Sequence, residues 1–255
     1  MERQKVTATV ITFNEEKNID DCLKSIEWAD EIIVIDSEST DNTVQIANKY
    51  TDKVFINPWP GHKQQKNYAI DKSSNNWILS IDADERVTPE LKEFVLQVLK
   101  SPEADGFRFP RLNHFLGTLI RHGGWYPDHV LRLFRKDKGR FGGMNPHDIV
   151  KIDDGTIVTT KAPLIHYTYN SLEQFMDKIN QYSSIAAKEK FKKNKKYYLL
   201  PLLIILKPIW KFIEVYVVKL AFLDGFHGFI IAAAASISIF WRYTKIWALA
   251  KSNKN

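Results

Sequence analysis

Three carboxylates follow an apolar segment in the stretch WILSIDADERV, residues 77–87. Asp82 and Asp84 are two positions apart, and Glu85 follows directly. Carboxylates with this spacing at the end of a strand are able to converge on one divalent cation, since Mg²⁺ and Mn²⁺ prefer oxygen ligands. A cation with so few protein ligands takes further oxygens from its substrate, typically from a diphosphate. The alternative is that the three side chains only end the strand and cap the next helix.

A second apolar segment, IIVID, ends in Asp36 and is followed by the polar sequence SESTDNT. A carboxylate at this position is able to accept hydrogen bonds from the base or the ribose of a nucleotide, and a helix cap is the alternative. The first apolar segment ends in a polar loop with Thr12, Asn14 and Glu15, where dinucleotide-binding folds have a glycine-rich fingerprint. The chain has neither that fingerprint nor a P-loop, which argues against NAD-dependent enzymes and ordinary ATPases.

The segments that carry these residues alternate between the patterns of strands and helices. Runs rich in β-branched side chains predict strands, and apolar side chains three or four positions apart predict the helices between them. Such alternation is typical of a parallel sheet with helices on both faces, whose ligands bind at the carboxyl ends of the strands. The predicted strands are 6–12, 32–36, 53–57 and 77–82, and the predicted helices between them are 19–26, 44–47 and 64–70.

Two further helices have clear start signals. Thr88 and Pro89 combine a capping residue with a proline at the first helical position. Ser171 and Gln174 match a capping box. Between these two starts, residues 107–170 are rich in glycine, arginine, histidine and aromatic residues, which predicts a half with short strands and long loops.

The bulk composition predicts an intracellular protein with a substantial core. The chain has 255 residues, 44% of them hydrophobic, which is enough for one large domain with an extension. Its single cysteine, Cys22, excludes an intramolecular disulfide and fits a reducing compartment. The N-terminal residues lack the apolar core and the cleavage site of a signal peptide, and we therefore expect the body of the protein to stay in the cytosol.

The basic side chains are concentrated in the C-terminal part. Residues 186–255 carry 13 lysine and arginine side chains against three acidic ones. This asymmetry predicts an anionic partner, and the apolar runs between the lysines favour a lipid surface over nucleic acid. The longest uncharged run, residues 225–241, is shorter than the ~20 residues that usually span a bilayer. We therefore expect helices that lie on the membrane. A re-entrant hairpin, one spanning helix, and a soluble helical core or dimer interface are the alternatives.

Several of these segments together resemble the family 2 inverting glycosyltransferases, whose nucleotide-sugar-binding fold is of the GT-A type. The segments in family order are VITFNEEKNIDDCLKSI, IIVIDSESTDNTVQIA, QQKNYAI and WILSIDADERVTPEL. Three more are similar to the subgroup of lipopolysaccharide core β-glucosyltransferases: GGWYPDHVLRLFRKDKGRF, NPHDIV and LIHYTYNSLEQFMDKINQYS. The likeness extends from about residue 6 to residue 245. Each motif alone is weak, but their shared order is specific.

The resemblance implies an organisation and an activity. It implies a GT-A catalytic domain over residues 1–170, with a nucleotide-binding half to about residue 105 and an acceptor-binding half over 106–170. A membrane-associated helical region would follow over 171–255. The implied reaction is metal-dependent transfer of a hexose, glucose from UDP-glucose being favoured, to a membrane-held glycolipid such as the lipopolysaccharide inner core. A polyprenyl phosphate acceptor, another glycolipid or nucleotide sugar, and a non-catalytic nucleotide-sugar-binding protein are the alternatives.

The same resemblance implies roles for the residues at the strand ends. The uracil of the donor would contact Asp36, and the diphosphate and sugar would lie near Lys66 and Asn67. The residues implied to bind the nucleotide sugar are Thr12, Asn14, Glu15, Asp36, Lys66, Asn67, Asp82 and Arg132. A homodimer is also compatible with the resemblance, and the implied location is the cytoplasmic face of the inner membrane.

For catalysis, the resemblance implies one base and one cation. Asp82 and Asp84 match the Asp-x-Asp motif that holds Mn²⁺ or Mg²⁺, with Asp84 favoured as the direct ligand. Asp148, in NPHD, falls at the position of the catalytic base, where the subgroup usually has glutamate after a histidine. His147 is a candidate to orient Asp148 or to touch the diphosphate, with a satisfied structural histidine as the alternative.

Two other pairs of residues are candidates for substrate contacts. Arg132 and Arg135 have guanidinium groups that match phosphate oxygens, with a salt bridge as the alternative. Trp125 and Tyr126 are able to stack on a sugar of the acceptor, with a place in the core as the alternative.

Overall fold

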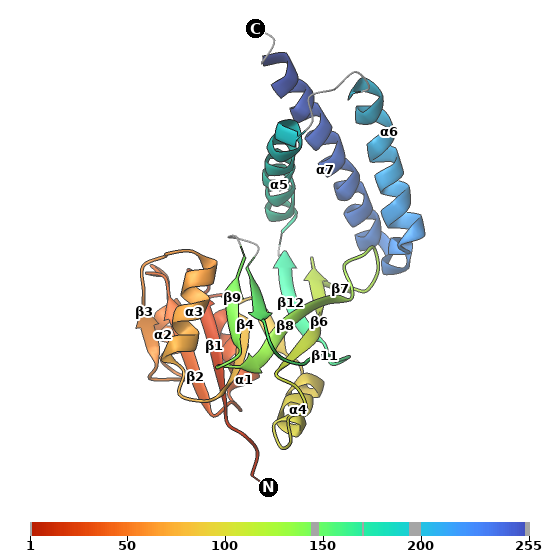
Figure 1. Cartoon of the computed structure of the whole chain (residues 1–255). Helices are drawn as coiled ribbons and strands as arrows, with labels where there is room; N and C mark the ends of the chain where they lie inside the picture. Colours follow the sequence, from red (N-terminus) through yellow and green to blue (C-terminus); the bar gives the residue numbers. More distant parts are fainter. Residues whose placement is uncertain (1, 144–147, 170, 194–199, 253–255) are drawn as a thin grey trace. The chain divides into compact units, whose positions relative to one another are not determined.

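The computed structural model describes residues 2–143, 148–169, 171–193 and 200–252 (Figure 1). The chain divides into two compact units. The first contains Met1–Leu112 and Asp128–His166, and the second contains Asn113–Pro127 and Tyr167–Asn255. The predicted start of the helical region, residue 171, lies close to the point where the second unit resumes. The stretch 113–127 was not predicted to belong with the helices.

The first unit is built on a sheet whose first four strands are parallel. They lie in the spatial order β3-β2-β1-β4, as expected from the alternation of strands and helices. In this register Thr12 is level with Asp36, and Ile11 is level with Asp82. The polar residues that follow these strands therefore share one edge of the sheet. The bounds are β1 (Val6–Thr12), β2 (Glu31–Asp36), β3 (Val54–Ile56) and β4 (Trp77–Asp82).

The sheet continues beyond β4 in the order β8-β6-β12-β5. The pairing of β8 with β4 and with β6 is antiparallel, and so is that of β12 with β5. Two further strands pair with β6, β7 antiparallel and β11 parallel. The strand-rich half that the composition predicts is present, and it makes the sheet mixed. The bounds are β5 (Glu85–Val87), β6 (Gly106–Phe115), β7 (Thr118–Ile120), β8 (Asp128–Arg135), β11 (Ile157–Thr159) and β12 (Leu164–Tyr169). A separate antiparallel pair consists of β9 (Gly139–Gly142) and β10 (Ile149–Ile152).

Helices cover both faces of the parallel strands, because alternate side chains of each strand point to opposite faces (Figure 1). Val10 and Leu79 belong to a core cluster with apolar side chains of α1 (Ile19–Ile26) and α4 (Pro89–Val98). Ile35 belongs to a different cluster, with Ala69 of α3 (His62–Lys72). The remaining helix of this unit is α2 (Thr43–Ala47).

The N-terminus of α4 shows which residue caps this helix, and therefore whether the carboxylates after β4 do so. Thr88 is the N-cap residue, and its Oγ1 accepts a hydrogen bond of 3.1 Å from the Leu91 N–H. Pro89 is the first helical residue, as predicted. Since β5 already begins at Glu85, the three carboxylates lie before this cap and do not supply it.

The second unit is helical, and α7 (Gly225–Ser252) packs against both α5 (Leu172–Lys193) and α6 (Leu200–Ile213) (Figure 1). Two short irregular helices, Glu214–Val218 and Ala221–Asp224, connect α6 to α7. The segment Ala221–Ser252 is long and apolar enough to cross a membrane by length and composition, with a mean hydropathy of 1.6.

The stretch 113–127 joins this unit because its rings pack on α5. The ring centroid of Phe115 lies 5.5 Å from that of Trp125 and 4.9 Å from that of Phe175. Trp125 therefore takes part in an apolar cluster, which is the alternative considered for this residue.

The edge of the sheet opposite the polar strand ends contains a buried carboxylate that links β2 to its neighbours. Glu31 accepts hydrogen bonds from Lys53 Nζ at 2.5 Å, from the N–H and Oγ of Ser74 at 2.8 Å each, and from Thr7 Oγ1. Burial opposes the charged form, but these donors outweigh it and lower the pKa of Glu31 to about 2.

This carboxylate makes stability depend on pH in a predictable direction. Because its pKa is about 2 in the folded state and 4.5 without these partners, it stabilises the fold above pH 4.5 and loses this effect as the pH falls toward 2. We expect Glu31→Gln to lower the free energy of unfolding by about 3 kcal/mol at neutral pH, and the difference from wild type to shrink between pH 4.5 and 2. Urea denaturation at several pH values in this range measures the free energy of unfolding of both proteins. If the difference between them does not change with pH, the low pKa of Glu31 is contradicted.

Candidate active site

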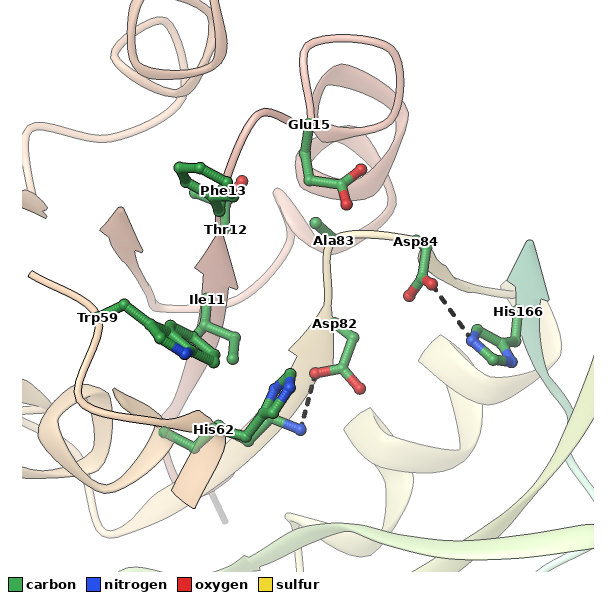
Figure 2. Close-up of a pocket in the computed structure, with 11 residues that line it drawn as sticks. Ile11, Thr12, Phe13, Glu15, Trp59, His62, Asp82, Ala83, Asp84 and His166 are labelled. Carbon is green, nitrogen blue, oxygen red and sulfur yellow. Dashed lines mark ion pairs between the residues drawn. The ribbon is translucent and has the colours of Figure 1, made fainter. Parts of the chain in front are cut away.

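A cavity of about 320 Å³ opens at the carboxyl ends of β1 and β4 (Figure 2). Its wall combines carboxylates, cationic groups and aromatic rings, from elements far apart in the sequence. The lining residues are Ile11, Thr12, Phe13, Glu15, Trp59, His62, Lys66, Asp82, Ala83, Asp84 and His166.

Lys66 joins two carboxylates at the base of this cavity. Its Nζ lies 2.9 Å from Asp82 Oδ1 and 3.3 Å from Asp148 Oδ2. The side chains of Lys66 and Asp148 are 9% and 4% exposed, and that of Asp82 is 27% exposed toward the cavity. The ammonium also lies over the ring of Phe141, 5.1 Å from its centroid. The structure thus brings together three residues that the resemblance implicated separately.

Arg132 pairs with the second carboxylate oxygen of Asp82. Its Nη2 donates to Asp82 Oδ2 and, at 2.7 Å, to Glu85 Oε1, while the Asp82 N–H donates to Glu85 Oε2 at 3.0 Å. Glu85 is fully buried, and Arg132 is 5% exposed. Burial favours the neutral form of Asp82, but Arg132 and Lys66 outweigh it and hold the pKa of Asp82 well below its usual range. Asp82 is therefore a carboxylate fixed between two cations.

This network bears on two residues that the resemblance implicated. Both oxygens of Asp82 are paired with cationic side chains, and its roles at the cation and at the donor stay predictions. Arg132 makes the buried salt bridge that was the alternative to a phosphate contact. Arg135 also makes a salt bridge, with Asp137 at 2.9 Å, and its side chain is 43% exposed outside the cavity.

Asp84 and His166 face each other across the open side of the cavity (Figure 2). The distance from His166 Nε2 to Asp84 Oδ2 is 3.3 Å, and the Asp84 side chain is 34% exposed. Burial lowers the pKa of His166, but Asp84 and Glu85 outweigh this effect and raise it above the usual value. Sequence reasoning missed His166, because only the pairing of β12 with β5 brings it level with Glu85.

A divalent cation fits these donors chemically. A carboxylate and an imidazole are both ligands of Mn²⁺, and Mg²⁺ needs only one or two carboxylates when phosphate oxygens complete its shell. Glu15 also lines the cavity, and burial together with the charge of Asp84 raises the pKa of Glu15 against the effect of its Asn18 hydrogen bond. Within the described ranges, no cluster of three or more histidine, cysteine or acidic residues is preformed for a metal.

The residues at the ends of β1 and β2 divide into two groups. Thr12 lines the cavity, and its Oγ1 is buried with no hydrogen-bond partner among the described residues. Asp36 is fully buried and accepts hydrogen bonds from the Ser39 N–H at 2.7 Å and from Ser39 Oγ at 2.5 Å. Asn14 accepts a hydrogen bond of 2.8 Å from the Thr40 N–H. Asp36 and Asn14 therefore shape the loop after β2 and do not line the cavity.

Asn67 has a structural partner. Its Nδ2 donates to the Phe141 carbonyl and its Oδ1 accepts from the Phe141 N–H, each at 3.0 Å. Both ends of the amide thus hold β9 beside α3, and the expected contact of Asn67 with the donor stays a prediction. His147 lies outside the described residues.

Comparison with protein families agrees with this geometry. Residues 7–156 match the model of glycosyl transferase family 2. The chain belongs to this family. It is a glycosyltransferase, and its mixed sheet with flanking helices is the GT-A type fold that the sequence resemblance predicts.

Two relatives cover nearly all of this glycosyltransferase. A protein of Rickettsia typhi named as an uncharacterized glycosyltransferase is 31% identical over 268 residues, which cover 99% of this chain and 90% of the relative. The lipopolysaccharide core biosynthesis glycosyltransferase LpsC of Rhizobium meliloti is 30% identical over 257 residues, with 95% and 92% covered. The crystal structure of TarS 1–349 from S. aureus in complex with UDP covers 97% of this chain and 92% of that one, with 16% identity and a TM-score of 0.48. Likeness at that level assigns neither a substrate nor residue roles.

The ion pairs of Arg132 with Asp82 and Glu85 form the scaffold of the transferase site, and their effect on stability is measurable. We expect Arg132→Met to lower the free energy of unfolding by about 3–5 kcal/mol, because it leaves the buried Glu85 carboxylate with only the longer contact of 3.8 Å to Arg111 Nη1. The matched control is Arg135→Met, which removes an exposed ion pair and should change stability by less than about 1 kcal/mol. Equal effects of the two changes in urea denaturation would contradict the scaffold role.

Proposed function

We propose that this glycosyltransferase moves a hexose, glucose being favoured, from a UDP-sugar to a membrane-held glycolipid of the lipopolysaccharide core type. The observation that carries the proposal is that Lys66, in the wall of the cavity, pairs with both Asp82 and Asp148, while Asp84 lines the same cavity. We infer that these groups serve as the base and as the place for a diphosphate. The relative LpsC, matched over 92% of its length, supports the choice of acceptor class.

In this proposal, Asp84 and His166 hold a Mn²⁺ or Mg²⁺ ion. The bound ion supplies an electrostatic charge that offsets the negative charge of the departing diphosphate. Asp82 does not bind the ion. It holds Lys66 at the cavity wall, where the ammonium is able to interact with a phosphate oxygen. Thr12 and Glu15 line the same cavity, and the unpaired Thr12 hydroxyl is able to bond a polar group of the nucleotide.

Asp148 acts as the base. As the acceptor hydroxyl oxygen forms its bond to C1 of the sugar, its proton passes to the Asp148 carboxylate. The bond between C1 and the diphosphate oxygen breaks, and UDP leaves with the electron pair. Attack from the face opposite the leaving group inverts the configuration at C1. The ammonium of Lys66 lies 3.3 Å from Asp148 Oδ2 and is the cationic partner of this buried carboxylate.

Activity measurements separate the two carboxylate roles. We expect Asp84→Asn and Asp148→Asn each to lower kcat for UDP release at least about 100-fold, since each removes a group that acts in the transition state. Asp137→Asn, an exposed carboxylate outside the cavity, is the control and should keep wild-type activity. Chelation with EDTA should abolish turnover of the wild type, and Mn²⁺ should restore it. Full activity of Asp84→Asn in EDTA would contradict the cation role.

The second unit provides a surface for the membrane that holds the acceptor. Apolar side chains lie three or four positions apart along one side of α6, and each is at least 39% exposed. Lys207 and Lys211 flank them, and their charge suits anionic lipid head groups. We therefore propose that this face lies on the cytoplasmic leaflet of the inner membrane. It consists of Leu202, Ile205, Leu206, Ile209, Trp210 and Ile213, and we name it the α6 face.

Vesicle binding tests the α6 face. We expect replacement of Leu206 and Ile209 by glutamate to lower co-sedimentation with phosphatidylglycerol-containing vesicles at least about tenfold, because two large side chains lose burial in lipid. Val158→Glu is the control, since Val158 is 40% exposed in the first unit. Unchanged vesicle binding by a folded double variant would contradict the assignment.

A further inference from the structure

An exposed indole ring stands in the wall of the cavity without a place in the core. The side chain of Trp59 is large and apolar, and yet the residue is 48% exposed. Among the described residues, its aromatic contact is with His62, edge-on, with ring centroids 4.7 Å apart. Both rings line the cavity (Figure 2). Because a ring with a structural role is normally buried, the exposed face of Trp59 calls for another explanation.

The backbone that carries this ring is stiff and firmly attached. Pro58 and Pro60 flank Trp59, and each proline restricts its own φ and the residue before it. Behind them, Asn57 Nδ2 donates to Gln65 Oε1 at 2.6 Å, and Gln65 Nε2 donates back to the Asn57 carbonyl at 3.1 Å. A ring presented by such a loop loses little conformational freedom when a ligand covers it.

The attachment of this loop indicates which part of the donor it meets. The Asn57 N–H donates to the Asp36 carbonyl at 2.8 Å, so the loop begins beside the end of β2. In Figure 2, Trp59 lies next to Ile11 and His62, whereas Asp84 and His166 lie beyond Asp82 on the other side. If the diphosphate binds at Asp84, Trp59 contacts the part of the donor that lies farther from the cation.

We propose that Trp59 is the stacking platform for the base of the UDP donor and sets the affinity for the nucleotide. This inference rests on the proposed function, because it takes UDP as the ligand. Stacking on an aromatic face suits any planar base, and it needs no hydrogen bond from the ring. The sugar and the diphosphate have no planar aromatic face to offer.

Calorimetric titration of the full chain with UDP and Mn²⁺ tests this role. Trp59→Ala should bind UDP about 5- to 100-fold more weakly than wild type, the range for loss of one stack between a base and an aromatic side chain. Trp59→Phe keeps a ring and should stay within about threefold. Trp247→Ala is the matched control, since Trp247 is 43% exposed on α7 and should leave UDP affinity unchanged. Equal melting temperatures without UDP would show that the variants remain folded.

Three outcomes would overturn the inference in different ways. Equal UDP affinity of wild type and Trp59→Ala would remove Trp59 from the nucleotide site, and a loss in Phe13→Ala alone would place the base on Phe13, which is 55% exposed in the same cavity. A loss seen with UDP-glucose but not with UDP would place the sugar on the ring. No UDP binding by wild type would overturn the proposed donor itself, so failure of the function and failure of this inference are distinguishable.

Discussion

The site depends on the ion pairs that Lys66 makes with Asp82 and Asp148. Charged groups with so little exposure are costly to bury, and only close opposite charges make the arrangement stable. The ammonium of Lys66 therefore fixes three separate parts of the chain: α3, the end of β4 and the segment before β10. Arg132 and Glu85 complete the network on the other side of Asp82. Lys66, Asp82 and Arg132 each pair with two opposite charges, so the network links these side chains in one chain of ion pairs.

This network explains why a core strand ends in three carboxylates. Asp82 and Glu85 are the counter-ions of buried cations, so they belong to the scaffold. Asp84 lies in the turn between β4 and β5, where its side chain is open to the cavity. A scaffold with paired charges on both sides of this turn holds Asp84 in one place, which the proposed cation site needs. In that proposal, Asp82 and Glu85 serve stability and Asp84 serves the chemistry.

The sequence predicted the parts of this molecule that depend on local patterns. The strands β1 to β4, the helices between them and the Thr88 cap follow from periodicity and capping residues a few positions apart. It did not predict the pairing of Asp82 with Arg132 or of Asp84 with His166, because the partners are 50 and 82 residues apart and meet only through the sheet. The hydrogen bonds of Asn67 with Phe141 were not predicted either, because the two residues are 74 positions apart. The grouping of residues 113–127 with the helices also depends on tertiary packing of rings.

The most direct test of the central claim is anomalous diffraction at the manganese edge from crystals grown with UDP and Mn²⁺. We expect one peak at coordinating distance from an Asp84 oxygen, with His166 and diphosphate oxygens as further ligands and with Asp82 still paired to Lys66 and Arg132. A peak bound directly by Asp82, with its pairs to Lys66 and Arg132 broken, would contradict the account.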